Sequence, residues 1–202
     1  GVFFLEEFPE FDRRVIESLR QPLEDRVIQI ARARGSMTFP ANFILIATMN
    51  PCPCGHKGVR GKECICSAGA LMKYERKISG PIIDRIDLWL DVPVVEYEKL
   101  SQKGGGGESS AKIKERVMLA RAKQATRGAK LNSQISAKEI EKLAPLSDSC
   151  VKLLNTSAKQ LDLSARAYHR IIKLARTIAD LASAPNIKEE HLLEALQYRP
   201  KK

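Results

Sequence analysis

Two adjacent acids, Glu6 and Glu7, directly follow the short apolar run Val2–Leu5. An apolar run of this length is typical of a strand that is buried on both faces of a parallel sheet. Ligands of open α/β sheets bind outside the carboxyl ends of such strands. Two carboxylates at that place can hold a metal ion and orient an attacking water. An acidic turn that merely meets solvent would leave the same pattern, so the interpretation needs a second strand.

A second apolar run, residues 43–50, also ends in a polar side chain, that of Asn50. Beside the two acids, Asn50 can position a water or a γ-phosphate. The pair of strands then has the chemistry of a Walker B strand and its neighbour in a P-loop ATPase. The simpler alternative is an asparagine that caps the turn after its strand.

Four cysteines follow with the spacing C-x-C-x₉-C-x-C: Cys52, Cys54, Cys64 and Cys66. Four thiolates satisfy a closed tetrahedral Zn²⁺ site, although the usual spacing is C-x₂₋₄-C. The alternatives are reduced loop cysteines without a metal, or His56 as one of the ligands. If zinc holds the loop, Lys57, Arg60 and Lys62 are presented to DNA. The fifth cysteine, Cys150, is expected in the core of a helix.

Composition and charge suit one or two globular domains, with 202 residues, 29% charged residues and a net charge of +10. The positive charge favours nucleic acid or another acidic partner, with a basic solvated surface as the alternative. No apolar stretch approaches the roughly 18 residues that span a bilayer, and no signal peptide is visible. We therefore expect a cytoplasmic protein with no membrane partner. Because it opens at Gly1, inside a strand, we expect a fragment of a longer protein.

The elements that must position these side chains follow from periodicity and turn residues. Residues 1–98 predict an α/β fold. A helix over Phe11–Leu19 should end near Pro22. The remaining expected elements are a hairpin of Val27–Ala31 and Met37–Phe39, a helix over Ser67–Ser79 and a third core strand over Ile86–Val92.

The second half of the sequence predicts helices. Residues 99–110 are expected to be a linker because Gly104–Gly107 and their polar neighbours cannot form a core. Residues 111–202 predict an all-helical domain, whose first helix has an apolar face of Ile113, Val117 and Ala120. The later helices are expected to open at a capping box of Ser136 and Glu139, at Ser149, at a Ser164 cap, and at Asn186 with Glu189.

Four long motifs resemble the magnesium-chelatase-like AAA+ ATPases, and most closely their ComM/YifB branch. They are GVFFLEEFPEFDRRVIESLRQPLEDR, TFPANFILIATMNPCPCG, GPIIDRIDL and SARAYHRIIKLARTIADLA. The resemblance implies the C-terminal half of a P-loop AAA+ αβα core, followed by a helical lid domain. The sequence contains no G-x-x-x-x-G-K-[ST] motif, which lies upstream of Walker B in that family. We therefore expect this chain to be inactive as an ATPase alone.

The resemblance also assigns roles to five residues. Glu6 stands where the family usually has an Asp that holds Mg²⁺ through water, and Glu7 matches the catalytic base. Asn50 matches sensor 1, Arg85 the arginine finger and Arg166 the sensor 2 position of the lid. The cofactors implied are ATP and Mg²⁺, besides the Zn²⁺ that the cysteines suggest.

Arginines near these positions leave alternatives open. Arg85 can instead form a salt bridge with Asp84 or Asp87, which are its neighbours in sequence. Arg26 is a weaker candidate for a contact between subunits. The hairpin also carries arginines, Arg26, Arg32 and Arg34, which can track a phosphate backbone if the hairpin faces a ring pore.

Three functions remain to be compared. The leading hypothesis, which the resemblance implies, is a homo-oligomeric ring, expected to be a hexamer, that hydrolyses ATP. It would act on DNA in branch migration and recombination of incoming DNA during competence. The second is a chelatase-type ATPase that remodels a protein partner for magnesium insertion into a porphyrin. The third is a non-catalytic, zinc-dependent DNA-binding module. The paired motifs at Glu6, Glu7, Asn50, Arg85 and Arg166 argue against the third.

Overall fold

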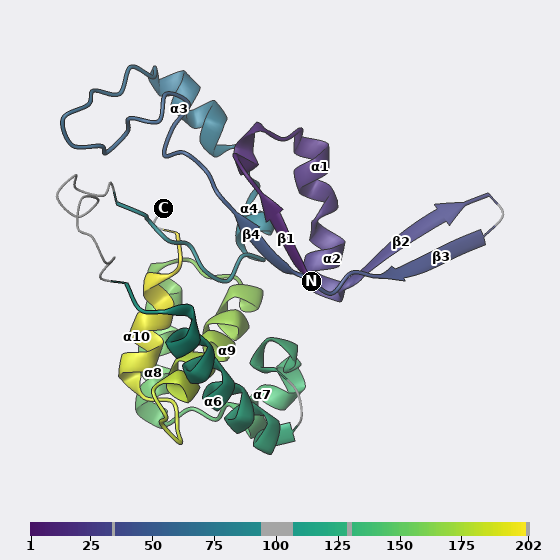
Figure 1. Cartoon of the computed structure of the whole chain (residues 1–202), viewed down its shortest axis with the longest axis vertical. Helices are drawn as coiled ribbons and strands as arrows, with labels where there is room; N and C mark the ends of the chain where they lie inside the picture. Colours follow the sequence, from purple (N-terminus) through teal and green to yellow (C-terminus); the bar gives the residue numbers. More distant parts are fainter. Residues whose placement is uncertain (34, 94–106, 129–130, 201–202) are drawn as a thin grey trace. The chain divides into compact units, whose positions relative to one another are not determined.

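The computed structural model describes residues 1–33, 35–93, 107–128 and 131–200 (Figure 1). It divides into two compact units, Gly1–Ile86 and Asp87–Lys202, which are described separately below. The predicted linker, 99–110, lies mostly outside the described residues. None of the helices in the described ranges is both long and apolar enough to cross a membrane.

The first unit contains a parallel pair of strands, β1 (Val2–Leu5) and β4 (Ile44–Ala47). Their register aligns Leu5 with Ala47, so both strands end at the same edge. This confirms the two predicted strands and their common carboxyl edge, where the polar residues follow.

The expectation that β1 is buried on both faces is wrong for the described residues. Leu5 is buried, but Val2, Phe3 and Phe4 are 64%, 41% and 50% exposed. Successive side chains of a strand point to opposite faces, so both faces of β1 are open. The apolar run does form a strand, as predicted. A sheet of two strands, however, leaves the side chains of β1 with few others to pack against.

Two short helices follow β1, α1 (Arg13–Ser18) and α2 (Arg20–Asp25). The Asp12 side chain caps α1 by accepting a hydrogen bond from the Arg14 backbone N–H at 2.7 Å. The predicted break comes at Leu19, ahead of Pro22. Pro22 lies in the first turn of α2, where the missing N–H costs no helical hydrogen bond. Arg26 then ends α2 in a left-handed conformation, with φ 58°.

The predicted β-hairpin is confirmed as β2 (Val27–Arg32) paired antiparallel with β3 (Gly35–Pro40). It extends as a two-stranded ribbon in Figure 1. Apolar side chains on it remain exposed, namely Ile28, Ile30, Met37 and Phe39. Ile28 pairs with Phe39 and Ile30 with Met37, so these side chains share one face, which no layer covers in the described part of the unit.

The region after β4 differs from prediction. The helix expected over Ser67–Ser79 is the shorter α3 (Ala68–Glu75), and α4 (Gly80–Ile83) follows it. The strand expected over Ile86–Val92 is absent, because residues 84–93 contain no strand. Leu90 and Val92 are 67% and 86% exposed. Alternation alone cannot make a strand without a neighbouring strand to pair with. Here the backbone N–H of Trp89 donates instead to the carbonyl of Tyr198, at 2.9 Å.

The second unit is a helical bundle. Its main helices are α6 (Ser110–Gly128), α7 (Ile140–Leu143), α8 (Asp148–Gln160), α9 (Ala165–Leu181) and α10 (Glu189–Gln197). Buried side chains of α8, α9 and α10, among them Leu154, Ile171, Ala175 and Leu192, form its core. Cys150 is buried at the start of α8, as predicted. On α6, Ala120 is buried whereas Ile113 and Val117 are 42% and 37% exposed.

The helix caps test the sequence interpretation directly. Ser164 accepts a hydrogen bond from the Ala167 N–H at 3.2 Å, and Glu139 accepts from the Ser136 N–H at 2.9 Å, both as predicted. The cap of α10 is different from the expected Asn186 and Glu189. The Lys188 N–H donates to Nδ1 of His191 at 3.0 Å. An imidazole three residues into the helix thus takes the place that Glu usually has in a capping box.

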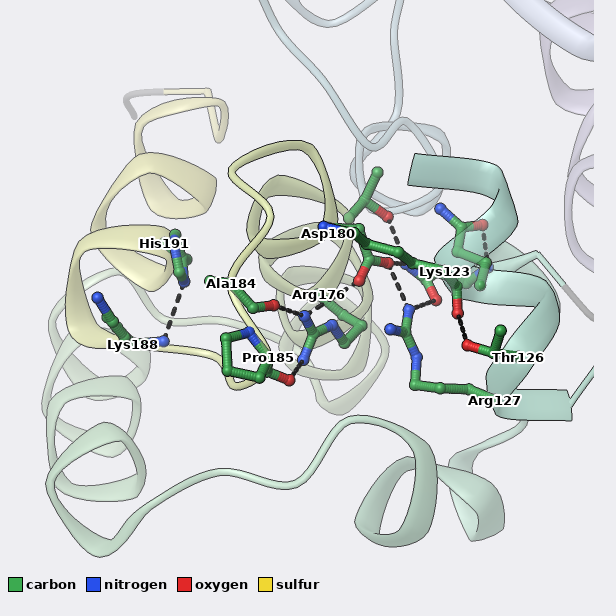
Figure 2. A network of polar contacts seen from close by, with 12 residues as sticks. Lys123, Thr126, Arg127, Arg176, Asp180, Ala184, Pro185, Lys188 and His191 are labelled. Carbon is green, nitrogen blue, oxygen red and sulfur yellow. Dashed lines mark hydrogen bonds and ion pairs between the residues drawn. The ribbon is translucent and has the colours of Figure 1, made fainter. Parts of the chain in front are cut away.

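A buried ion-pair network joins α6, α9 and the loop before α10 (Figure 2). The Arg176 and Asp180 side chains are 2% and 0% exposed, and their charged atoms lie 3.0 Å apart. Arg127 of α6 forms a second ion pair with Asp180. The guanidinium of Arg176 also donates to the carbonyls of Ala184 and Pro185, at 2.8 and 3.0 Å.

We expect Asp180→Ala to lower the free energy of unfolding of the helical unit by about 3–5 kcal/mol, because it leaves the buried Arg176 charge without its carboxylate. The measurement is urea unfolding followed by fluorescence of Trp89, the single tryptophan, which lies in this unit. Glu141→Ala, at an exposed acid of α7, is the control and should change stability by less than about 0.5 kcal/mol. Equal effects of both substitutions would contradict a stabilising role for the network.

Candidate active site and metal centre

The acid pair lies directly after β1, and the backbone holds Glu7 in an unusual conformation. Its φ and ψ are 50° and 48°, in the left-handed region. Backbone hydrogen bonds fix the chain on both sides of the pair. The Thr48 N–H donates to the Leu5 carbonyl at 2.9 Å, and the Phe8 N–H donates to the Thr48 carbonyl at 2.8 Å.

A left-handed conformation is uncommon for a residue with a side chain and costs of order 1–3 kcal/mol where it persists. Such residues concentrate at functional sites because the surrounding structure must enforce them. At Glu7 the two flanking hydrogen bonds tie the turn to β4 and provide that constraint. The side chains of Glu6 and Glu7 are both exposed, so a metal ion and a water can reach them.

Asn50 lies three residues beyond the end of β4, at the same carboxyl edge as the acids. Its side chain is exposed, and its backbone carbonyl accepts a hydrogen bond from the Tyr74 hydroxyl at 3.0 Å. Tyr74 is buried in α3, so it anchors the segment that carries Asn50. The structure thus brings Glu6, Glu7 and Asn50 to one edge, and Tyr74 is a positioning residue that sequence reasoning missed.

Arg85 follows α4, and its side chain is only 12% exposed. Its Nε lies 3.3 Å from Oε2 of Glu24, in α2, and its Nη1 donates to the Pro81 carbonyl at 2.8 Å. Sequence reasoning offered Asp84 or Asp87 as alternative partners of Arg85, and the structure adds Glu24, which lies far away in the sequence. Only the folded chain shows this pairing.

Arg166 belongs to the other unit, where it is exposed in the first turn of α9 next to the Ser164 cap. Helix N-termini attract anions because their first N–H groups lack helical partners. Arg170, one turn later in α9, forms an ion pair with Asp87. Its Nη1 lies 2.7 Å from Oδ1 of Asp87.

The four loop cysteines converge. Their sulfur atoms all lie within 4.8 Å of one another. The Cys52–Cys54, Cys52–Cys64 and Cys54–Cys64 sulfur distances are 3.4, 3.7 and 3.6 Å. A tetrahedron of sulfurs about 2.3 Å from a central Zn²⁺ has edges of about 3.8 Å. The spacing of these thiols therefore fits one tetrahedral ion, and His56 is not part of the cluster.

Local backbone and charge explain how the loop brings the thiols together. Gly55 and Gly58 have φ near 77° and 78°, which permits tight turns between the two cysteine pairs. The His56 backbone N–H, as the largest contribution, lowers the pKa of Cys54 to about 6. Burial raises the pKa of Cys66 to about 12. Thiols this close cannot ionise independently, and a bound cation would favour the thiolate form of all of them.

An ion pair connects this loop to α3. Lys57 Nζ lies 3.0 Å from Oε1 of Glu75, and this hydrogen bond to the carboxylate raises the pKa of Lys57. Lys57 therefore helps to hold the loop against α3, and its side chain stays exposed, as do those of Arg60 and Lys62. The expectation that all three cations face DNA stays a prediction.

Comparison with known proteins covers nearly the whole chain. The family described as magnesium chelatase, subunit ChlI, matches residues 1–100, and the ChlI C-terminal family matches residues 107–199. The competence protein ComM of Haemophilus influenzae is 45% identical over 199 residues, 98% of this chain. The uncharacterized YifB proteins of Salmonella typhimurium and Escherichia coli are both 42% identical over the same length. The chain spans only 39% of the length of each of these relatives.

Proposed function

The chain belongs to the magnesium chelatase ChlI family, and from this premise we propose that it supplies half of the nucleotide site of an AAA+ ATPase. The observation that carries the proposal is the carboxyl edge of the parallel pair. There a left-handed Glu7, its neighbour Glu6 and Asn50 come together after two adjacent strands. In this proposal the first unit is the C-terminal half of the core, and the helical unit is the lid.

Each site residue has one task in the proposed mechanism. Glu7 accepts the proton of the attacking water, and Asn50 orients that water. Glu6 would hold Mg²⁺, with a longer side chain in place of the usual Asp of the family. Bound Mg²⁺ supplies charge stabilisation for phosphoryl transfer. Arg166 binds phosphate at the start of α9, and Arg85 acts on the site of a neighbouring subunit in a hexameric ring.

DNA is the substrate that charge and relatives favour. The chain carries a net charge of +10, and a relative of 45% identity is named a competence protein. Exposed cations among the described residues include Arg32 on β2 and Lys57, Arg60 and Lys62 of the cysteine loop. We place the protein in the cytoplasm, where it acts on incoming DNA in recombination. The family description favours one alternative, a chelatase-type motor that remodels a protein partner.

ATP turnover of the intact protein, with and without branched DNA, tests the function. The expected result is hydrolysis that rises when branched DNA is added, and no protein-specific hydrolysis by the 202-residue chain alone. A rate of ATP hydrolysis that does not change with DNA but rises with a protein partner would support the chelatase-type alternative. Absence of hydrolysis in the intact, assembled protein would overturn the proposal.

The cysteine cluster completes the proposal as a structural zinc site. Four thiolates close the coordination sphere and leave no open position, so the ion serves folding and not catalysis. Elemental analysis of protein purified without chelator should find about one zinc per chain. Cys64→Ser should remove the metal and loosen the loop, whereas Cys150→Ala, at the buried cysteine outside the cluster, should retain it. A metal-free protein whose four loop cysteines all react as thiols would contradict the zinc site.

A further inference from the structure

A hollow of about 350 Å³ lies between α1 and α3, apart from both the acid pair and the cysteine cluster. Four of its lining residues are cations: Arg13, Lys73, Arg76 and Lys77. Gly69 and Met72 of α3 complete it. In α3 and its cap, residues 69, 72, 73 and 76 share one helix face because they follow the i, i+3, i+4, i+7 spacing.

Three of these cations are uncompensated. Lys77 pairs with Glu10, its Nζ lying 3.0 Å from Oε2. Arg13, Lys73 and Arg76 form no ion pair with any residue that the structure describes, and all three are exposed. Like charges gathered around one hollow repel one another, so the arrangement is costly unless an anion joins it. The one carboxylate of α3, Glu75, is already paired with Lys57.

The lining also indicates which anion fits. It consists of flexible cationic arms around an open depression, with a half-exposed Met72 and no aromatic ring on which a base could stack. Cations without base-recognising groups bind the phosphate backbone, which carries no sequence information. A run of regularly spaced phosphates can contact cations from α1 and α3 together.

We propose that the hollow between α1 and α3 is a binding site for the phosphodiester backbone of nucleic acid, held by Arg13, Lys73 and Arg76. This inference rests on the DNA part of the proposed function and names the surface involved. The proposed DNA contact then lies on the first unit. It is close to the segment that carries Asn50, because Tyr74 of α3 anchors that segment.

The test is fluorescence anisotropy of a labelled DNA duplex with the 202-residue chain, repeated over a series of salt concentrations. Arg13→Gln/Lys73→Gln/Arg76→Gln should weaken binding roughly 10- to 100-fold at low salt. It should also reduce the salt slope by about 0.9 for each lost contact, or about 2.7 in total. The control, Arg14→Gln/Lys112→Gln/Lys114→Gln, removes the same charge from exposed positions of α1 and α6 outside the hollow. It should change the slope by less than about 1.

Gly69 gives a second pair of variants that keeps the fold. A Cβ at Gly69 meets open space, and an acid in the first turn of a helix is favourable. Gly69→Glu therefore places a negative charge in the hollow without destabilising α3, and it should weaken DNA binding. Gly69→Gln, of the same size but neutral, should weaken it far less. Equal binding by these two variants would overturn the proposal.

The remaining outcomes separate this inference from the function. If the hollow variant and the control variant weaken DNA binding equally, the hollow is not the DNA-binding site. The proposed action on DNA would still stand. No DNA binding by the unsubstituted chain or the intact protein would overturn both. Inorganic triphosphate, titrated alone, tests for free phosphate as the ligand. If the three hollow substitutions abolish triphosphate binding but not DNA binding, the hollow belongs to free phosphate and the proposal fails.

Discussion

Arg85→Ala in the intact protein is expected to lower ATP turnover by about 10³–10⁵-fold, the range of an arginine finger, while nucleotide binding persists. In the proposed ring the finger acts on the neighbouring subunit, so its own subunit should keep every phosphate contact. Turnover and nucleotide affinity should be measured on the same assembled protein. A loss of affinity equal to the loss of turnover would contradict this role.

The Glu24 pairing of Arg85 provides a sharper control. The Arg85 side chain is 12% exposed and its Nε lies 3.3 Å from Glu24, so Glu24→Gln removes a charged partner of Arg85. If Arg85 served only the fold, turnover should fall in Glu24→Gln as well. A finger needs no such partner during catalysis, so Glu24→Gln should retain turnover. Rings mixed from Arg85→Ala and Glu7→Gln subunits should recover some activity, since some interfaces then combine an intact finger with an intact base. No recovery in rings shown to be mixed would exclude action between subunits.

Local patterns predicted the parts of the fold that depend on local chemistry. The apolar runs before Glu6 and Asn50 are strands, and Ser164 caps its helix as its side chain and position require. The cysteine spacing predicted a cluster, which the structure shows. The cap joins residues three apart, whereas the strands and the cysteine cluster were predictable because apolar runs and clustered thiols allow few other structures.

Features that depend on distant partners could not be predicted. The alternation over Ile86–Val92 resembles a strand, but a strand also needs a neighbour, and the Trp89 N–H finds the Tyr198 carbonyl instead. The ion pair between Arg85 and Glu24 could not be predicted, because Glu24 lies far from Arg85 in the sequence. The hollow between α1 and α3 was missed because Arg13 and Lys73 come together only in the folded chain.

Glu7→Gln in the intact protein is expected to reduce turnover by about 10²–10⁴-fold, the usual contribution of a general base, with little change in nucleotide affinity. Gln retains the size and hydrogen-bonding capacity of the side chain but cannot accept the proton of the attacking water. Binding rests on the phosphate contacts elsewhere in the site, so affinity and turnover should separate. Glu115→Gln, at an exposed acid of α6 in the other unit, is the matched control and should leave both unchanged.

The left-handed backbone of Glu7 allows a second variant that separates chemistry from folding. Glycine adopts φ 50° without steric cost, so Glu7→Gly should relieve local strain and leave thermal stability equal or higher. Turnover should nevertheless fall as far as in Glu7→Gln, because both variants lack the carboxylate. A natural sequence that keeps Glu in a conformation better suited to Gly accepts strain for the sake of that carboxylate. Near-normal turnover in either variant would remove Glu7 from the role of base, and a drop in stability for Glu7→Gly would show that the side chain serves the fold.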